Sequence, residues 1–77
     1  MSSNLYWRPR TSGEKPLSDE LKYALKNSDK FNQDLDCTIG DSWLDYLSGL
    51  RDAGIKDAQK LIDAIEKYGE IELKERY

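Results

Sequence analysis

The stretch KDAQKLIDAIEKYGEIELKERY, residues 56–77, decides the fold. In its first half, apolar side chains recur at helical spacing and predict a helix over residues 56–68, with one face formed by Ala58, Leu61, Ile62 and Ile65. Gly69 is the residue type that commonly ends a helix. After Gly69, apolar residues recur at every second position. Ile71 and Leu73 alternate with charged residues, which predicts a strand with one buried face.

A second helix is predicted immediately upstream. Asp41 or Ser42 can cap it, and Gly54 stands where a left-handed residue ends a helix. Between them, the apolar residues share one face: Trp43, Leu44, Leu47 and Leu50. Only about two residues separate the two helices, and such a short connection predicts an αα-hairpin.

The N-terminal half predicts shorter elements. Residues 1–3 are expected to be disordered, residues 5–8 to form a strand stopped by Pro9, and residues 10–16 to form a polar loop. Ser18 can cap a third helix that ends near residues 27–30, with an apolar face of Leu17, Leu21, Ala24 and Leu25. Alternation over residues 35–39 predicts a short strand with Leu35, Cys37 and Ile39 on one side.

An isolated strand at each end of a chain is not stable, so we expect the two terminal strands to pair. The sequence therefore predicts one α+β domain over residues 1–77. Its small antiparallel sheet of two or three strands pairs the N- and C-terminal strands, and three helices including the C-terminal αα-hairpin cover it. Leu5, Trp7, Ile71 and Leu73 are expected in the core, and Lys74 and Glu75 are expected to protect an exposed sheet edge.

Length and composition limit the class of protein. The chain has 77 residues, 38% of them hydrophobic, and a net charge of −3. A domain of this size has a thin stability margin, and dimerisation or a partner could supply further burial. Long apolar runs are absent and Cys37 stands alone, which indicates no membrane association and a cytoplasmic protein.

Catalytic and metal-binding patterns are weak. The sequence has no histidine, and its glycines form no phosphate-binding loop. The spacing from Asp34 to Asp45 is loosely that of a calcium loop, but Ile39 occupies the position that requires glycine, so a strand is favoured. The turn at Gly54 loosely matches a helix-hairpin-helix motif, but Lys56 replaces its second glycine. We expect no enzymatic activity, no cofactor and no metal.

Two surfaces are candidates for contact with a partner. Tyr6, Arg8 and Arg10 surround Trp7, and such residues are enriched in protein interfaces and can also stack on nucleic-acid bases. Residues 31–49 contain four aspartates and no basic residue, which could attract a basic partner. The predicted partner-binding residues are Tyr6, Arg8, Arg10, Asp34, Asp36 and Asp41. Net acidity disfavours nucleic acid as a partner.

Four segments together resemble short uncharacterised proteins encoded in bacteriophage and prophage genomes: LYWRP at 5–9, LSDELK at 17–22, LSGLRDAGI at 47–55 and LIDAIEKYG at 61–69. The resemblance implies a phage accessory protein in the host cytoplasm and carries no assigned activity. The leading hypothesis is a non-enzymatic protein-binding module that acts on a host or phage protein, including anti-phage defence machinery. The alternative is single-stranded nucleic-acid binding through the Arg- and aromatic-rich N-terminus.

Overall fold

The computed structural model describes residues 4–9, 13–29 and 37–76, in which two strands precede the first helix and one strand follows the last. The strands are β1 (Asn4–Pro9), β2 (Lys15–Pro16), β3 (Cys37–Gly40) and β4 (Glu70–Arg76). The helices are α1 (Asp19–Lys26), α2 (Leu44–Asp52) and α3 (Ala58–Tyr68), and a short 3-10 turn, η1 (Asp41–Trp43), precedes α2. The architecture is α+β, as predicted.

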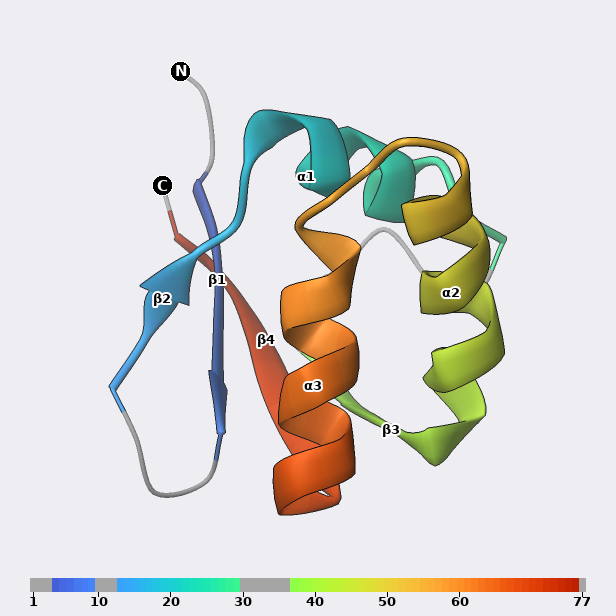
Figure 1. Cartoon of the computed structure of the whole chain (residues 1–77). Helices are drawn as coiled ribbons and strands as arrows, with labels where there is room; N and C mark the ends of the chain where they lie inside the picture. The colour runs from blue at the N-terminus through green and yellow to red at the C-terminus, as the bar shows by residue number, and fades with distance from the viewer. Residues whose placement is uncertain (1–3, 10–12, 30–36, 77) are drawn as a thin grey trace.

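The pairing of the two terminal strands forms the centre of the sheet (Figure 1). β1 runs antiparallel to β4 in a continuous register from Asn4 opposite Arg76 to Pro9 opposite Ile71. β2 adds to the outer side of β1 and β3 to the outer side of β4, which gives the order β2-β1-β4-β3. The predicted pairing of the chain ends is therefore confirmed.

Two details of the predicted sheet are wrong. The sheet has four described strands instead of two or three, because Lys15 and Pro16, assigned to a polar loop, pair with Trp7 and Tyr6. The chain returns along β1 there, and proline is tolerated at a sheet edge. Lys74 and Glu75 were expected at an exposed edge strand, but β4 is an inner strand between β1 and β3, which pairs with its residues Glu70–Leu73.

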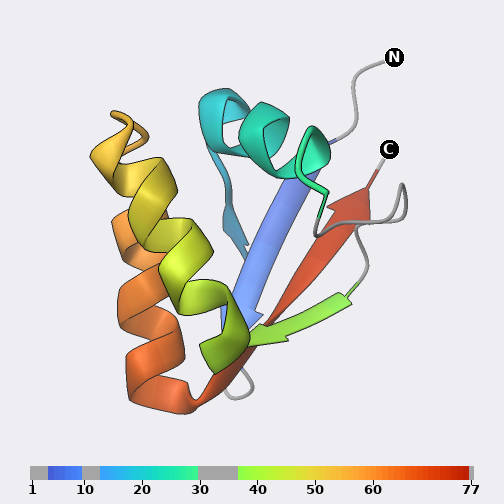
Figure 2. The same ribbon diagram turned by 90° about the vertical axis from the view of Figure 1, so that its right-hand side faces the viewer.

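The described helices all lie on one side of the sheet (Figure 2). α3 packs on β4 and β1, and α2 packs against α3, which confirms the αα-hairpin. Alternate residues of the strands enter this layer, and Trp7 on β1 faces Leu73 on β4 across the central register. The buried apolar core consists of Leu5, Trp7, Leu21, Leu25, Ile39, Leu47, Ala58, Leu61, Ile62, Ala64, Ile65, Ile71 and Leu73.

Local signals set most helix ends. The Ser18 hydroxyl accepts a hydrogen bond from the Leu21 amide at 3.3 Å, so the predicted cap of α1 is present. Gly54 and Gly69 have φ angles of 107° and 88°, which L side chains rarely adopt. The cap predicted at Asp41 or Ser42 is wrong, since η1 leads directly into α2 and the N-cap residue Trp43 makes no side-chain cap bond.

Polar contacts attach α1 to the rest of the fold. The Lys26 ammonium group lies 2.8 Å from a carboxylate oxygen of Glu75 on β4, whose side chain is only 8% exposed. The Tyr46 hydroxyl on α2 donates to the Ala24 carbonyl at 3.3 Å. These contacts place the C-terminal turn of α1 between the sheet and α2.

We predict that Leu73→Ala destabilises the protein by about 2–5 kcal/mol, because it removes a fully buried side chain from the centre of the sheet. Tyr23→Ala is the control, since Tyr23 is 65% exposed on α1, and its effect should stay within about 0.5 kcal/mol. Urea unfolding followed by far-UV circular dichroism measures both. Equal effects of the two substitutions would contradict this account of the core.

Candidate functional site

Strand alternation gives the sheet a second, polar face. On β1, Leu5, Trp7 and Pro9 are buried, whereas Tyr6 and Arg8 point to the opposite side and are partly exposed. On β4 the same side carries Glu70, Glu72, Lys74 and Arg76. The described helices all pack on the other side (Figure 2). We call the surface formed by Tyr6, Arg8, Glu14, Thr38, Glu70, Glu72, Lys74 and Arg76 the open face.

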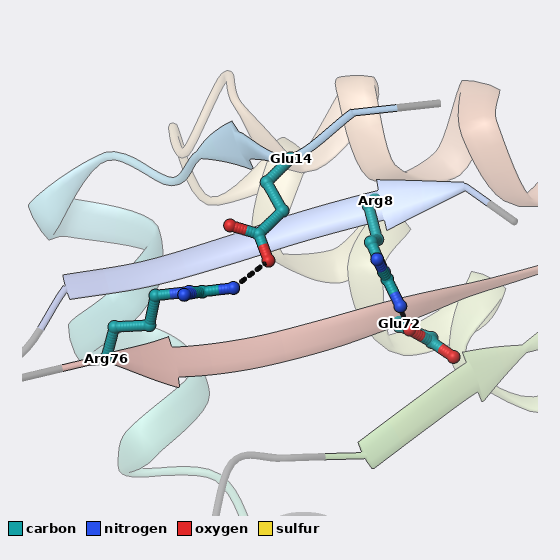
Figure 3. Close-up of polar contacts among 4 residues, drawn as sticks. All are labelled: Arg8, Glu14, Glu72 and Arg76. Atoms are coloured by element: carbon teal, nitrogen blue, oxygen red, sulfur yellow. Dashed lines mark hydrogen bonds and ion pairs between the residues drawn. The ribbon is translucent and has the colours of Figure 1, made fainter. Parts of the chain in front are cut away.

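Two ion pairs span the open face (Figure 3). Arg8 on β1 donates through Nε to Oε2 of Glu72 on β4, its partner in the register, at 2.8 Å. Arg76 donates through Nη2 to Oε1 of Glu14 just before β2, at 2.5 Å. Both pairs link segments far apart in sequence and place opposite charges beside each other on this face.

Tyr6 lies in the middle of this arrangement. In the register it faces Lys74 on one side and Pro16 on the other, and it is half-buried. The charges around it are balanced. Among the described residues of the open face, three are basic (Arg8, Lys74, Arg76) and three are acidic (Glu14, Glu70, Glu72). The face is therefore polar and mixed in sign, with one aromatic ring at its centre.

A shallow hollow lies where β3 meets β4. Its volume is about 180 Å³, and it is lined by Cys37, Thr38, Glu72, Leu73 and Lys74. The hollow is too small for a drug-sized ligand, whose pockets generally start at about 300 Å³. It could accept one side chain of a protein partner.

The structure brings together only part of the predicted site. Tyr6 and Arg8 share the open face. Asp41 is exposed on η1, which follows β3, two strands away from β1. Arg10, Asp34 and Asp36 lie outside the described residues, as does much of the acidic stretch. Of the predicted N-terminal surface, the structure therefore describes Tyr6 and Arg8. Of the predicted acidic surface, it describes Asp41.

The side chain of Trp7 lies on the opposite face of the sheet from those of Tyr6 and Arg8. Its side chain is 6% exposed and enters the core, as predicted, while Tyr6 and Arg8 face outward. Sequence reasoning missed Glu72, Lys74 and Arg76 as parts of the candidate site. The signal was present, because these residues alternate with Ile71 and Leu73 in the strand predicted there.

Cys37 is half-buried on β3 and contributes to the lining of the hollow. Within the described ranges, no group of three or more acidic, histidine or cysteine side chains is placed to hold a metal ion. The loosely calcium-like stretch runs partly through residues outside those ranges. Its described part forms β3 and η1, with Ile39 buried in the core.

No protein-family model, curated protein or solved structure was found to match this chain. Among the residues that the structure describes, no helix combines the length and the apolar character needed to cross a membrane.

We predict a weak coupling energy between Arg8 and Glu72, of about 0.2–1 kcal/mol. Their side chains are 41% and 37% exposed, so water screens the attraction between them. A double-mutant cycle with Arg8→Ala and Glu72→Ala, read by urea unfolding, measures this energy. A coupling of several kcal/mol would show that the open face contributes substantially to stability and is not principally available for contacts with a partner.

Proposed function

We propose that this chain is a non-enzymatic protein-binding module that uses the open face, centred on Tyr6 and Arg8, to contact its partner. One observation carries the proposal. The described helices cover one side of the sheet, and the other side presents Tyr6 amid ion-paired charges of both signs. Tyrosine and arginine are residue types that often dominate the energy of protein interfaces.

The charge balance of the open face favours a protein as its partner. A nucleic-acid backbone attracts a surface of one sign, because every phosphate is negative. The open face instead carries equal numbers of basic and acidic side chains, and such a mixture can match the mixed charges of a protein surface and fix its register. The rigid strands beneath Tyr6 and Arg8 limit the entropy lost on binding.

The biological setting of the proposal comes from the sequence resemblance to phage and prophage proteins. On that basis the chain is a phage accessory protein in the host cytoplasm, and its partner is a host or phage protein, including a component of anti-phage defence. A second copy of the chain is a further candidate partner, since a domain of 77 residues gains stability from additional burial.

Single-stranded nucleic-acid binding through the N-terminal Arg and aromatic residues is the alternative prediction. The structure makes it less favourable on this surface, since Trp7 enters the core and Arg8 is paired with Glu72. Only Tyr6 of the described N-terminal aromatic residues faces outward.

We predict that Tyr6→Ala and Arg8→Ala each weaken partner binding about tenfold or more, because each removes a central contact of the open face. The partner is first captured from nuclease-treated bacterial lysate with the tagged protein and identified by mass spectrometry. Its affinity for each purified variant is then measured by titration calorimetry.

Tyr23→Ala and Arg51→Ala are matched controls. Tyr23 lies on α1 and Arg51 on α2, so both are away from the open face, and both are exposed. The controls should bind the partner as the wild type does. Equal affinity for the Tyr6, Arg8 and control variants would reject the open face as the binding surface.

A further inference from the structure

A second surface, on the opposite side of β1, forms a groove between β2 and α3. Its volume is about 470 Å³, within the range of small-molecule sites, and it is lined by Trp7, Lys15, Lys60, Asp63, Ala64, Lys67 and Tyr68. β1 contributes Trp7 between these two elements, and Figure 1 shows β1 between β2 and α3. We name this surface the lysine groove.

The lysine groove is positively charged in an acidic protein. Three lysines and one aspartate line it, a balance of +2, whereas the chain carries −3 overall. The three lysines come from both walls: Lys15 from β2, and Lys60 and Lys67 from α3 two helical turns apart. Lysine is a compact positive charge that commonly binds phosphate groups. The groove is thus locally positive although the net charge of the chain is negative.

Aromatic rings hold two of these lysines in place. The Lys15 Nζ lies 5.0 Å from the centre of the Trp7 ring, and the Lys67 Nζ lies 5.3 Å from the centre of the Tyr68 ring. An ammonium group on a ring face forms a cation–π contact and has three N–H donors, so it can also donate to an anion. Lys60 is 69% exposed, and its Nζ lies 3.5 Å from Oδ1 of Asp57.

The groove also has an apolar wall and an acceptor. Tyr68 is 39% exposed, and Ala64 is the small side chain between Lys60 and Lys67 on the helix. Asp63 is oriented by neighbours, since its Oδ1 accepts from Gln59 Nε2 at 2.7 Å. The Gln59 amide oxygen in turn accepts from Arg51 at 2.6 Å. The second carboxylate oxygen of Asp63 can accept from a hydroxyl or amino group of a ligand.

From this combination we infer that the lysine groove binds a nucleoside phosphate. The phosphate would lie among the ammonium groups, the base against Tyr68 of the apolar wall, and a sugar hydroxyl or base amino group at Asp63. An acidic peptide fits less well, because it carries no planar base to lie against the Tyr68 ring. The ligand can be a free nucleotide or a unit of a single strand. The inference concerns a different surface from the proposed protein-binding face and does not depend on it.

The probe for this inference is adenosine monophosphate, titrated into the ¹⁵N-labelled full chain and followed by NMR. We expect saturable shifts of the amide signals of Lys15, Asp63, Lys67 and Tyr68. Adenosine alone and inorganic phosphate alone should each bind more weakly, because each has only half of the recognised chemistry. Affinity should also fall as salt is raised, since the lysines are at the surface.

Lys15→Gln and Lys67→Gln should each weaken binding of adenosine monophosphate about tenfold, as expected for the loss of a charged hydrogen bond. Lys56→Gln is the matched control, because Lys56 is exposed in the turn between α2 and α3 and does not line the groove. Unchanged circular dichroism would show that all three variants fold. A short deoxyadenylate oligomer is titrated in parallel. Tighter binding of the oligomer supports a single strand as the source, and tighter binding of the monophosphate supports a free nucleotide.

Three results would overturn the inference. The first is the absence of saturable shifts at the groove through the millimolar range. The second is equal binding by a hexaglutamate peptide, which would indicate a general attraction for anions. The third is equal loss of affinity in Lys56→Gln, which would place the effect in net charge and not in the groove.

Discussion

The antiparallel pairing of β1 with β4 is the constraint on which the rest of the structure depends. It joins residues more than sixty positions apart and forms the centre of a sheet that β2 and β3 extend outward. Trp7 and Leu73 are opposite each other in this pair, and α3 packs on the two strands. Closing so long a loop is entropically unfavourable, and burial of the core must compensate for it. The fold is therefore expected to be cooperative.

The same pairing produces both candidate surfaces. Because side chains alternate along a strand, each of β1 and β4 has an inner and an outer set of residues. The outer set contains Tyr6, Arg8 and Glu72, which form the centre of the open face. The inner set contains Trp7, which is part of the buried core and also lines the lysine groove. One register thus separates a face of balanced charge from a cationic groove.

Sequence patterns were sufficient where a segment had a strong period or a specific end signal. The α3 face, the stop at Gly69 and the inward positions of Ile71 and Leu73 all follow from local spacing. β2 was missed because two residues carry no period, and their pairing with β1 is decided by the path of the chain. Because β2 was not predicted, the lysine groove was not predicted either. Lys15 lies near α3 because β2 pairs with β1. On the open face, Tyr6 and Arg8 could be selected by residue type, but Glu72, the ion-pair partner of Arg8, could be identified only from the strand register. The distance of Asp41 from Tyr6 and Arg8 across the sheet could not be predicted from the sequence, because it depends on the strand order.

Native-state hydrogen exchange tests the central role of the β1–β4 pairing most directly. Amide protons of β1 and β4 that are hydrogen-bonded between the strands should exchange with the same opening free energy as the buried turns of α3, equal to the free energy of global unfolding. That result would show that the terminal strands and the helical layer open together. Exchange of the β1 amides through a smaller opening, with α2 and α3 still protected, would contradict the account and show that the helices fold without the closed chain.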